Sequence, residues 1–63
     1  MYIVIEMQNG IIGGNVWNYD SREEAESKYY TVLSVAAISE IEFHTAMLVT
    51  NEGFVLECKC YKH

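Results

Sequence analysis

Tyr2-Ile3-Val4-Ile5-Glu6-Met7-Gln8-Asn9-Gly10 is the stretch that decides the fold. It begins with a short run rich in β-branched side chains. Asn9-Gly10 is the dipeptide that most readily takes the two positive φ angles of a type I′ turn. The stretch therefore predicts a strand that turns back into a second strand. With Asn9 and Gly10 as the loop, the predicted pairs are Met7–Ile12 and Ile3–Val16 on one face, and Tyr2–Trp17 and Val4–Asn15 on the other.

Two adjacent glycines, Gly13 and Gly14, fall inside the second strand of this hairpin. Glycine adds no side-chain packing and loosens a ladder, so the pair predicts a bulge or a local bend. The same glycines are also compatible with being the turn itself, which leaves the register open.

A helix is predicted to begin at Asp20-Ser21-Arg22-Glu23, where an acceptor side chain precedes a glutamate by three residues. Three glutamates crowd its first turns, where negative charge complements the helix dipole. On a helical wheel the apolar residues gather on one face. The centre of this stripe is Ala25, Tyr29, Val32 and Ala36, flanked by Leu33 and Val35.

A second hairpin is predicted from the β-forming run Ile41–Thr50, the turn Asn51-Glu52-Gly53 and a return strand over Phe54–Tyr61. Alternation along the return strand predicts that Phe54, Leu56, Cys58 and Cys60 face the core, and that Val55, Glu57, Lys59 and Tyr61 face away. The register across the turn stays open. A two-residue loop places Met47 on the core face, and a three-residue loop places Ala46 and Leu48 there.

Together these segments predict an α+β fold of order ββαββ, a four-stranded, mainly antiparallel sheet with one helix packed on one face. The 63 residues form a single small domain, 1–63, which buries about 60% of the surface of its unfolded chain. One helix covers one face only. The uncovered face is predicted to hold Tyr2, Val4, Trp17, Val55 and Tyr61, with either Ala46 and Leu48 or Met47 and Val49.

Composition excludes several classes of protein. A net charge of −5 disfavours binding to nucleic acid or to an anionic membrane, because both require a concentrated basic surface. The 51% apolar content is too high for a disordered segment. No apolar run reaches the roughly 18 residues of a membrane span, and the first residues lack the basic region of a signal peptide. We expect a soluble, cytoplasmic protein.

Cys58 and Cys60 lie too close in sequence for a disulfide between them to cross-link distant parts of the chain. On a strand their Cα atoms are about 6.6 to 6.8 Å apart, at the limit of a disulfide, so we expect free thiols in a reducing compartment. With His63 or His44 they are the candidate metal ligands, but a fourth ligand is missing. Buried cysteines acting as small apolar residues explain them better. We therefore expect no metal and no cofactor.

No pattern predicts catalysis. A nucleophilic cysteine with His44 as its base needs an electropositive, partly exposed setting that nothing in the sequence fixes. Glu40 and Glu42 flank Ile41 with a spacing that acid–base pairs sometimes use. A position in the solvent-exposed segment that leads into the predicted strand explains these two glutamates better. The glycines match neither a phosphate-binding loop nor a dinucleotide fingerprint. The expectation is a protein that is not an enzyme and has no catalytic residues.

Three segments carry a resemblance to a known group of proteins. They are Tyr19-Asp20-Ser21-Arg22-Glu23-Glu24-Ala25-Glu26-Ser27-Lys28-Tyr29, then Glu52-Gly53-Phe54-Val55-Leu56, and the ending Cys60-Tyr61-Lys62-His63. In these segments, and over nearly the whole chain, the sequence resembles small uncharacterised proteins of gut Firmicutes and their prophages. The resemblance implies a bacterial cytoplasmic or phage-encoded origin. It implies no activity and assigns no role to any residue.

The surplus of apolar side chains on the uncovered face leads to the functional hypothesis. We expect a non-enzymatic interaction module that forms a homo-oligomer, a dimer in the first place, with Tyr2, Val4, Trp17, Val55 and Tyr61 at the interface. Another protein is a possible partner. One alternative is an acidic inhibitor that mimics nucleic acid in a basic protein cleft. The other is a small-molecule or metal site at the seam between copies.

Overall fold

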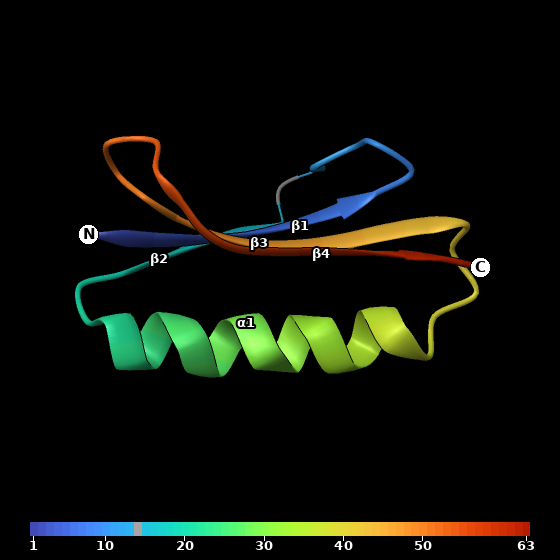
Figure 1. Cartoon of the computed structure of the whole chain (residues 1–63), viewed down its shortest axis with the longest axis horizontal. Helices are drawn as coiled ribbons and strands as arrows, with labels where there is room; N and C mark the ends of the chain where they lie inside the picture. The colour runs from blue at the N-terminus through green and yellow to red at the C-terminus, as the bar shows by residue number, and fades with distance from the viewer. Residues whose placement is uncertain (14) are drawn as a thin grey trace.

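A computed structural model describes residues 1–13 and 15–63. The elements follow the order β1 (Tyr2–Gln8), β2 (Val16–Tyr19), α1 (Arg22–Ala37), β3 (Phe43–Thr50) and β4 (Val55–Lys62). All neighbouring strands are antiparallel, in the order β2-β1-β3-β4. The helix runs along one face of the sheet (Figure 1), which confirms the predicted α+β class and the ββαββ order.

The first hairpin turns where the sequence predicts, but its register differs from the predicted one. Asn9 and Gly10 both have positive φ, 53° and 81°, and Gln8 bridges to Ile11. Further from the turn, Ile5 pairs with Val16, so the predicted Ile3–Val16 pairing is wrong by two residues. The predicted bulge at Gly13-Gly14 lies in the intervening segment, and Gly14 is outside the described residues. A shift of two residues leaves every side chain on its predicted side of the hairpin.

The helix begins within the predicted segment, but its cap is Ser21 and not the predicted acceptor Asp20, one residue earlier. The Ser21 hydroxyl accepts a hydrogen bond from the amide of Glu24 at 3.3 Å, which satisfies one of the orphan donors at the helix start. The predicted stripe is confirmed, since the buried residues of α1 are Ala25, Tyr29, Val32 and Ala36. Val35, predicted at the edge of that stripe, is exposed instead.

The second hairpin contains a bulge that reverses the predicted faces of β4. Leu48 pairs with Glu57 while Val49 pairs with Val55, so Leu56 is an extra residue. Leu56 therefore packs on the core, as predicted. Beyond the bulge, alternation places Glu57 on the helix side and Cys58 on the opposite side. The predictions that Phe54, Cys58 and Cys60 face the core are wrong, because all three are exposed. Ala46 and Leu48 are fully buried, as the three-residue loop predicts.

The helix covers the face that the sequence analysis expected to be open. Its core is made by Val4, Ala25, Tyr29, Val32, Ala46 and Leu48, with Tyr2, Trp17, Tyr19, Leu33 and Leu56 packed around it. The placement of Tyr2, Val4 and Trp17 on the uncovered face is therefore wrong. Tyr61 also lies on the helix side, because it pairs with the buried His44. Val55 alone of the five predicted residues stays on the open side, opposite Val49 and 55% exposed.

The physical reason for this reversal is that both faces of the sheet are apolar. Successive side chains of a strand point to opposite faces of the sheet, which divides the residues into two sets. When the two sets are similar in hydrophobicity, this alternation does not say which set meets the helix. In the structure the helix lies over the small side chain of Ala46, and aromatic rings from β1 and β2 pack around it. Ile3, Ile5 and Met47 are left on the other side.

Candidate functional site

The most extensive candidate site is the sheet face away from α1, which we call the open face. Strand pairing arranges it in three rows across the sheet. The rows are Val16–Ile5–Met47–Cys58, Asn18–Ile3–Val49–Val55 and Met7–Thr45–Cys60. Phe43 and Lys62 form a further pair at one end. Among residues 1–13 and 15–63, Lys62 is the only charged residue that strand pairing places on this face. Most of the surface is aliphatic or sulfur-bearing.

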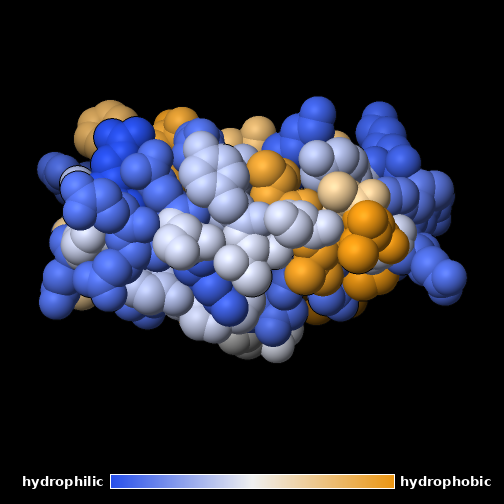
Figure 2. Space-filling view, turned by 90° about the horizontal axis from the view of Figure 1, so that it is seen from below, coloured by the Kyte–Doolittle hydropathy of each residue, from blue (hydrophilic) through white to orange (hydrophobic). Residues whose placement is uncertain are grey.

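The helix side of the molecule has a different character. Seen from that side, the surface is mostly hydrophilic, and its largest hydrophobic cluster lies at the right, over the C-terminal end of α1 (Figure 2). Val35 and Ile38 near that end are 51% and 86% exposed. The helix therefore presents a solvated surface with a small apolar patch, whereas the open face is apolar across all four strands.

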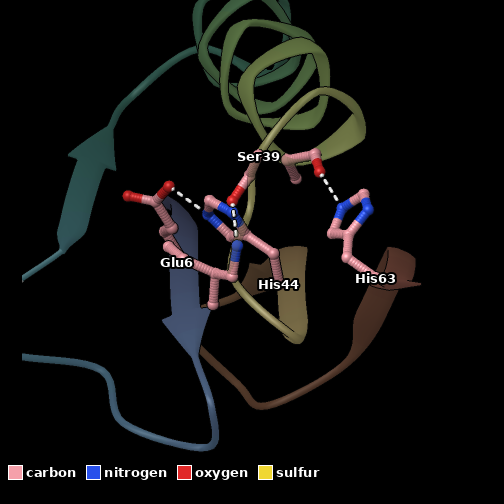
Figure 3. Close-up of polar contacts among 6 residues, drawn as sticks. Glu6, Ser39, His44 and His63 are labelled. Atoms are coloured by element: carbon pink, nitrogen blue, oxygen red, sulfur yellow. Dashed lines mark hydrogen bonds and ion pairs between the residues drawn. The ribbon is translucent and has the colours of Figure 1, made fainter.

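A buried polar pair lies at one end of the sheet, on the helix side. His44 on β3 is 1% exposed, and its Nε2 lies 2.6 Å from Oε2 of Glu6 on β1 (Figure 3). Because an ionised carboxylate only accepts hydrogen bonds, Nε2 is the donor. The other ring nitrogen, Nδ1, is buried and has no hydrogen-bond partner among the described residues. Among the residues that the structure describes, no third side chain hydrogen-bonds to the pair.

His63 stands near the same end of the fold without touching this pair. Its Nε2 donates to the carbonyl of Ala36 at 2.8 Å (Figure 3). Its amide donates to the carbonyl of Glu42 at 2.8 Å. Its ring stacks on Tyr61, with the ring centres 6.2 Å apart. The Ala36 carbonyl also accepts from the amide of Ser39 at 3.4 Å, so His63 adds a second hydrogen bond at the last turn of α1 and ties the end of β4 to the helix.

The three metal-ligand candidates from the sequence are not brought together. Cys58 and Cys60 are free thiols on the open face, and His63 lies on the helix side. Within residues 1–13 and 15–63, no three His, Cys, Asp or Glu side chains form a group that could hold a metal ion. His44 is also on the helix side, so a Cys–His catalytic pair does not form with either thiol.

Two tyrosines of α1 lie beside Glu57. Burial raises the pKa of Tyr29, and the negative charge of Glu57 adds to that rise. For Tyr30 the charge of Glu57 is the main cause of the raised pKa. The Tyr30 hydroxyl donates to Glu57 Oε1 at 3.4 Å, and the two tyrosine rings meet edge to face. A phenol with the ordinary pKa of 10.0 is already neutral at physiological pH, and the raised pKa of both tyrosines extends the neutral form to higher pH. Both side chains act here as packing and hydrogen-bonding groups.

Sequence reasoning missed the Glu6–His44 pair. His44 was considered only as a partner of the cysteines, whereas its pair with Glu6 follows from the register of two non-consecutive strands, β1 and β3. One signal was present in the sequence. If Ala46 and Leu48 face the core, alternation along β3 places His44 on the same side. If Val4 faces the core, alternation along β1 places Glu6 there too. The neighbour relationship of β1 and β3 was the missing step.

Comparison with family models, curated proteins and solved structures gives no match to this chain. The described residues contain no enclosed pocket, and the helix they form is not long and apolar enough to cross a membrane. The residues of the open face and of the Glu6–His44 pair therefore carry the functional argument by themselves.

Proposed function

We propose that this protein is a non-enzymatic interaction module that self-associates through its open face, with two copies packed sheet to sheet. The observation that carries the proposal is the continuity of apolar side chains across all four strands on that side. The central row, Val16–Ile5–Met47–Cys58, crosses the whole sheet without a charged residue. Contiguous apolar surfaces of several hundred Å² are uncommon on soluble monomers and mark contact surfaces.

The turns extend this surface beyond the strands. Both hairpin turns bend away from the helix, toward the open-face side, at opposite ends of the sheet (Figure 1). Each carries an exposed apolar residue close by, Ile11 at 68% and Phe54 at 66%. A second copy placed on the sheet would reduce the exposure of these side chains together with that of the rows.

The size of the molecule fits such a dimer. A standard interface buries about 800 Å² on each partner. The accessible surface of this chain is 4017 Å², so such an interface takes about a fifth of it. One long face of a body measuring 31 × 18 × 18 Å is a comparable share of its outside. The open face alone is therefore large enough, and no part of the helix side is needed.

Electrostatics also favours this face over others. The chain has nine acidic residues and a net charge of −5, which opposes association of two identical copies. The strands place none of these acids on the open face; Glu6 and Glu57 both lie on the helix side. Two copies that meet at the open face keep the carboxylates of their strands and helix on the outside, where water screens the repulsion.

The experiment is a mass measurement on matched lysine variants. Met47→Lys places a charge at the centre of the open face, and Ser27→Lys adds the same charge on the solvated side of α1, where residue 27 is exposed. By light scattering at micromolar concentration we expect a dimer for the natural protein and for Ser27→Lys, and a monomer for Met47→Lys with an unchanged circular dichroism spectrum. A dimeric Met47→Lys protein contradicts the proposal, as does a natural protein of 7.2 kDa in solution.

A further inference from the structure

Sulfur is concentrated on one side of the molecule. The chain contains three methionines and two cysteines, five sulfur atoms in all. Strand register places four of them on the open face, those of Met7, Met47, Cys58 and Cys60. The proposed self-association needs an apolar surface, but it does not need sulfur or thiols. This concentration therefore calls for its own explanation.

Three of these sulfur side chains are immediate neighbours. Cys58 and Cys60 are two residues apart on β4, so their side chains point to the same face. Met47 on β3 is the direct cross-strand partner of Cys58. Directly opposed residues have Cβ atoms about 4.5 to 5.5 Å apart, which brings the thioether of Met47 within reach of a ligand held by the thiols. Met7 is further away, because Thr45 separates it from Cys60 in its row.

The thiols are accessible. Both cysteines are free and exposed, and β4 is an edge strand of the sheet. The hydrogen bond of Cys60 Sγ to the carbonyl of Tyr61 is long, at 3.9 Å. Neither thiol is therefore packed in the core, and rotation about χ1 of each cysteine can bring the two sulfur atoms toward one ion.

We propose that Cys58, Cys60 and Met47 form a binding site for a single Cu(I) ion. Thiolate and thioether sulfur are soft ligands that favour Cu(I), zinc and iron–sulfur clusters, and a thioether beside two thiolates fits Cu(I) best. On binding, the two thiols release their protons and two copper–thiolate bonds form, with Met47 as a third ligand and no change in the oxidation state of the metal. The open face has no histidine or carboxylate in its strands to complete the four-ligand shell that Zn²⁺ requires.

The three ligands belong to one chain, because all of them lie on the β3–β4 hairpin. Met47 and Cys58 are also part of the central row of the open face, so the copper site overlaps the surface of the proposed self-association. Since one chain supplies all three ligands, we expect one Cu(I) for each chain.

The test is an anaerobic titration of the full chain with Cu(I) in competition with a coloured Cu(I) chelator. We expect one equivalent per chain, with affinity lowered at least 100-fold in Cys58→Ser and in Cys60→Ser, and at least 10-fold in Met47→Leu. Met7→Leu is the matched control, because it removes a sulfur atom from the same face but outside the proposed site, and it should leave the affinity unchanged. An equimolar amount of Zn²⁺ should not displace the copper.

Three outcomes would overturn the proposal. The first is that either serine variant, with a circular dichroism spectrum like that of the natural protein, retains the full affinity. The second is that Met47→Leu and Met7→Leu behave alike, which removes the thioether from the site. The third is a stoichiometry of one copper for two chains, which places the ligands on different copies.

Discussion

Glu6 and His44 form a buried hydrogen-bonded pair, Oε2 to Nε2 at 2.6 Å, that joins the two central strands of the sheet beneath the end of α1. The side chain of Glu6 is 12% exposed and that of His44 is 1% exposed. His44 Nε2 and Glu6 Oε2 satisfy each other in a place where water has little access. Removal of one partner leaves the other buried and unpaired, which costs more than the pair contributes.

The Glu6–His44 pair gives the first prediction. Glu6→Leu leaves His44 Nε2 without its acceptor and should lower the free energy of unfolding by about 1 to 3 kcal/mol in urea denaturation. The double variant Glu6→Leu/His44→Leu should recover part of this loss, since an apolar pair of similar volume has no unpaired polar group. Glu52→Gln, in the exposed turn, is the control and should change little. Equal stability of Glu6→Leu and Glu52→Gln would show that the pair is not formed.

The cap of α1 gives the second prediction. Ser21→Ala removes the hydroxyl that accepts from the amide of Glu24, so the free energy of unfolding should fall by about 0.5 to 2 kcal/mol. Ser27→Ala removes a hydroxyl from an exposed position inside the same helix and should have no comparable effect. Thermal denaturation of the two variants, followed by circular dichroism, gives the comparison. A loss in Ser27→Ala as large as that in Ser21→Ala would argue against this cap.

The buried phenol gives the third prediction. The pKa of Tyr29 is raised above its ordinary value of 10.0 by burial and by Glu57, so the folded state favours the neutral phenol. This contribution to stability is fully present below pH 10, and it is lost as the pH rises through the pKa of the folded state. Urea denaturation between pH 8 and pH 11 should show a decline that is smaller in Tyr29→Phe. An identical decline in both proteins would assign the effect to other groups.

A cation over an aromatic ring gives the fourth prediction. The ammonium of Lys28 lies 4.2 Å from the centre of the Trp17 ring, where the helix meets the edge strand β2. Lys28→Met keeps the length and helix propensity of the side chain but removes its charge, and it should cost about 0.5 to 1 kcal/mol. In a Trp17→Leu background the same change should cost nothing. A cost that persists in that background contradicts a contact between the two side chains.

Local signals in the sequence predicted the elements well. Asn9-Gly10 predicted the first turn, Ser21 lies in the predicted helix start, and the spacing of Ala25, Tyr29, Val32 and Ala36 predicted the buried stripe. Each of these depends on residues within one or two turns of each other. For that reason, short-range physics was sufficient to predict the ββαββ order.

The features that sequence did not predict depend on contacts between distant segments. The two apolar faces of the sheet differ too little for alternation to say which one meets the helix, and Val4 was placed on the wrong one. The bulge at Leu56 reverses the faces of β4 and is set by the pairing with Leu48 and Val49. The Glu6–His44 pair needs β1 beside β3, a neighbour relationship that the order of elements along the chain does not specify.

The most direct test of the central claim is an isotope-filtered NOE measurement on a mixture of labelled and unlabelled protein, which detects only contacts between copies. Self-association through the open face predicts intermolecular NOEs from the methyl groups of Ile5 and Met47, in the central row of that face. Intermolecular NOEs confined to Val35 and Ile38, on the helix side, or no intermolecular NOEs at millimolar concentration, would contradict the account.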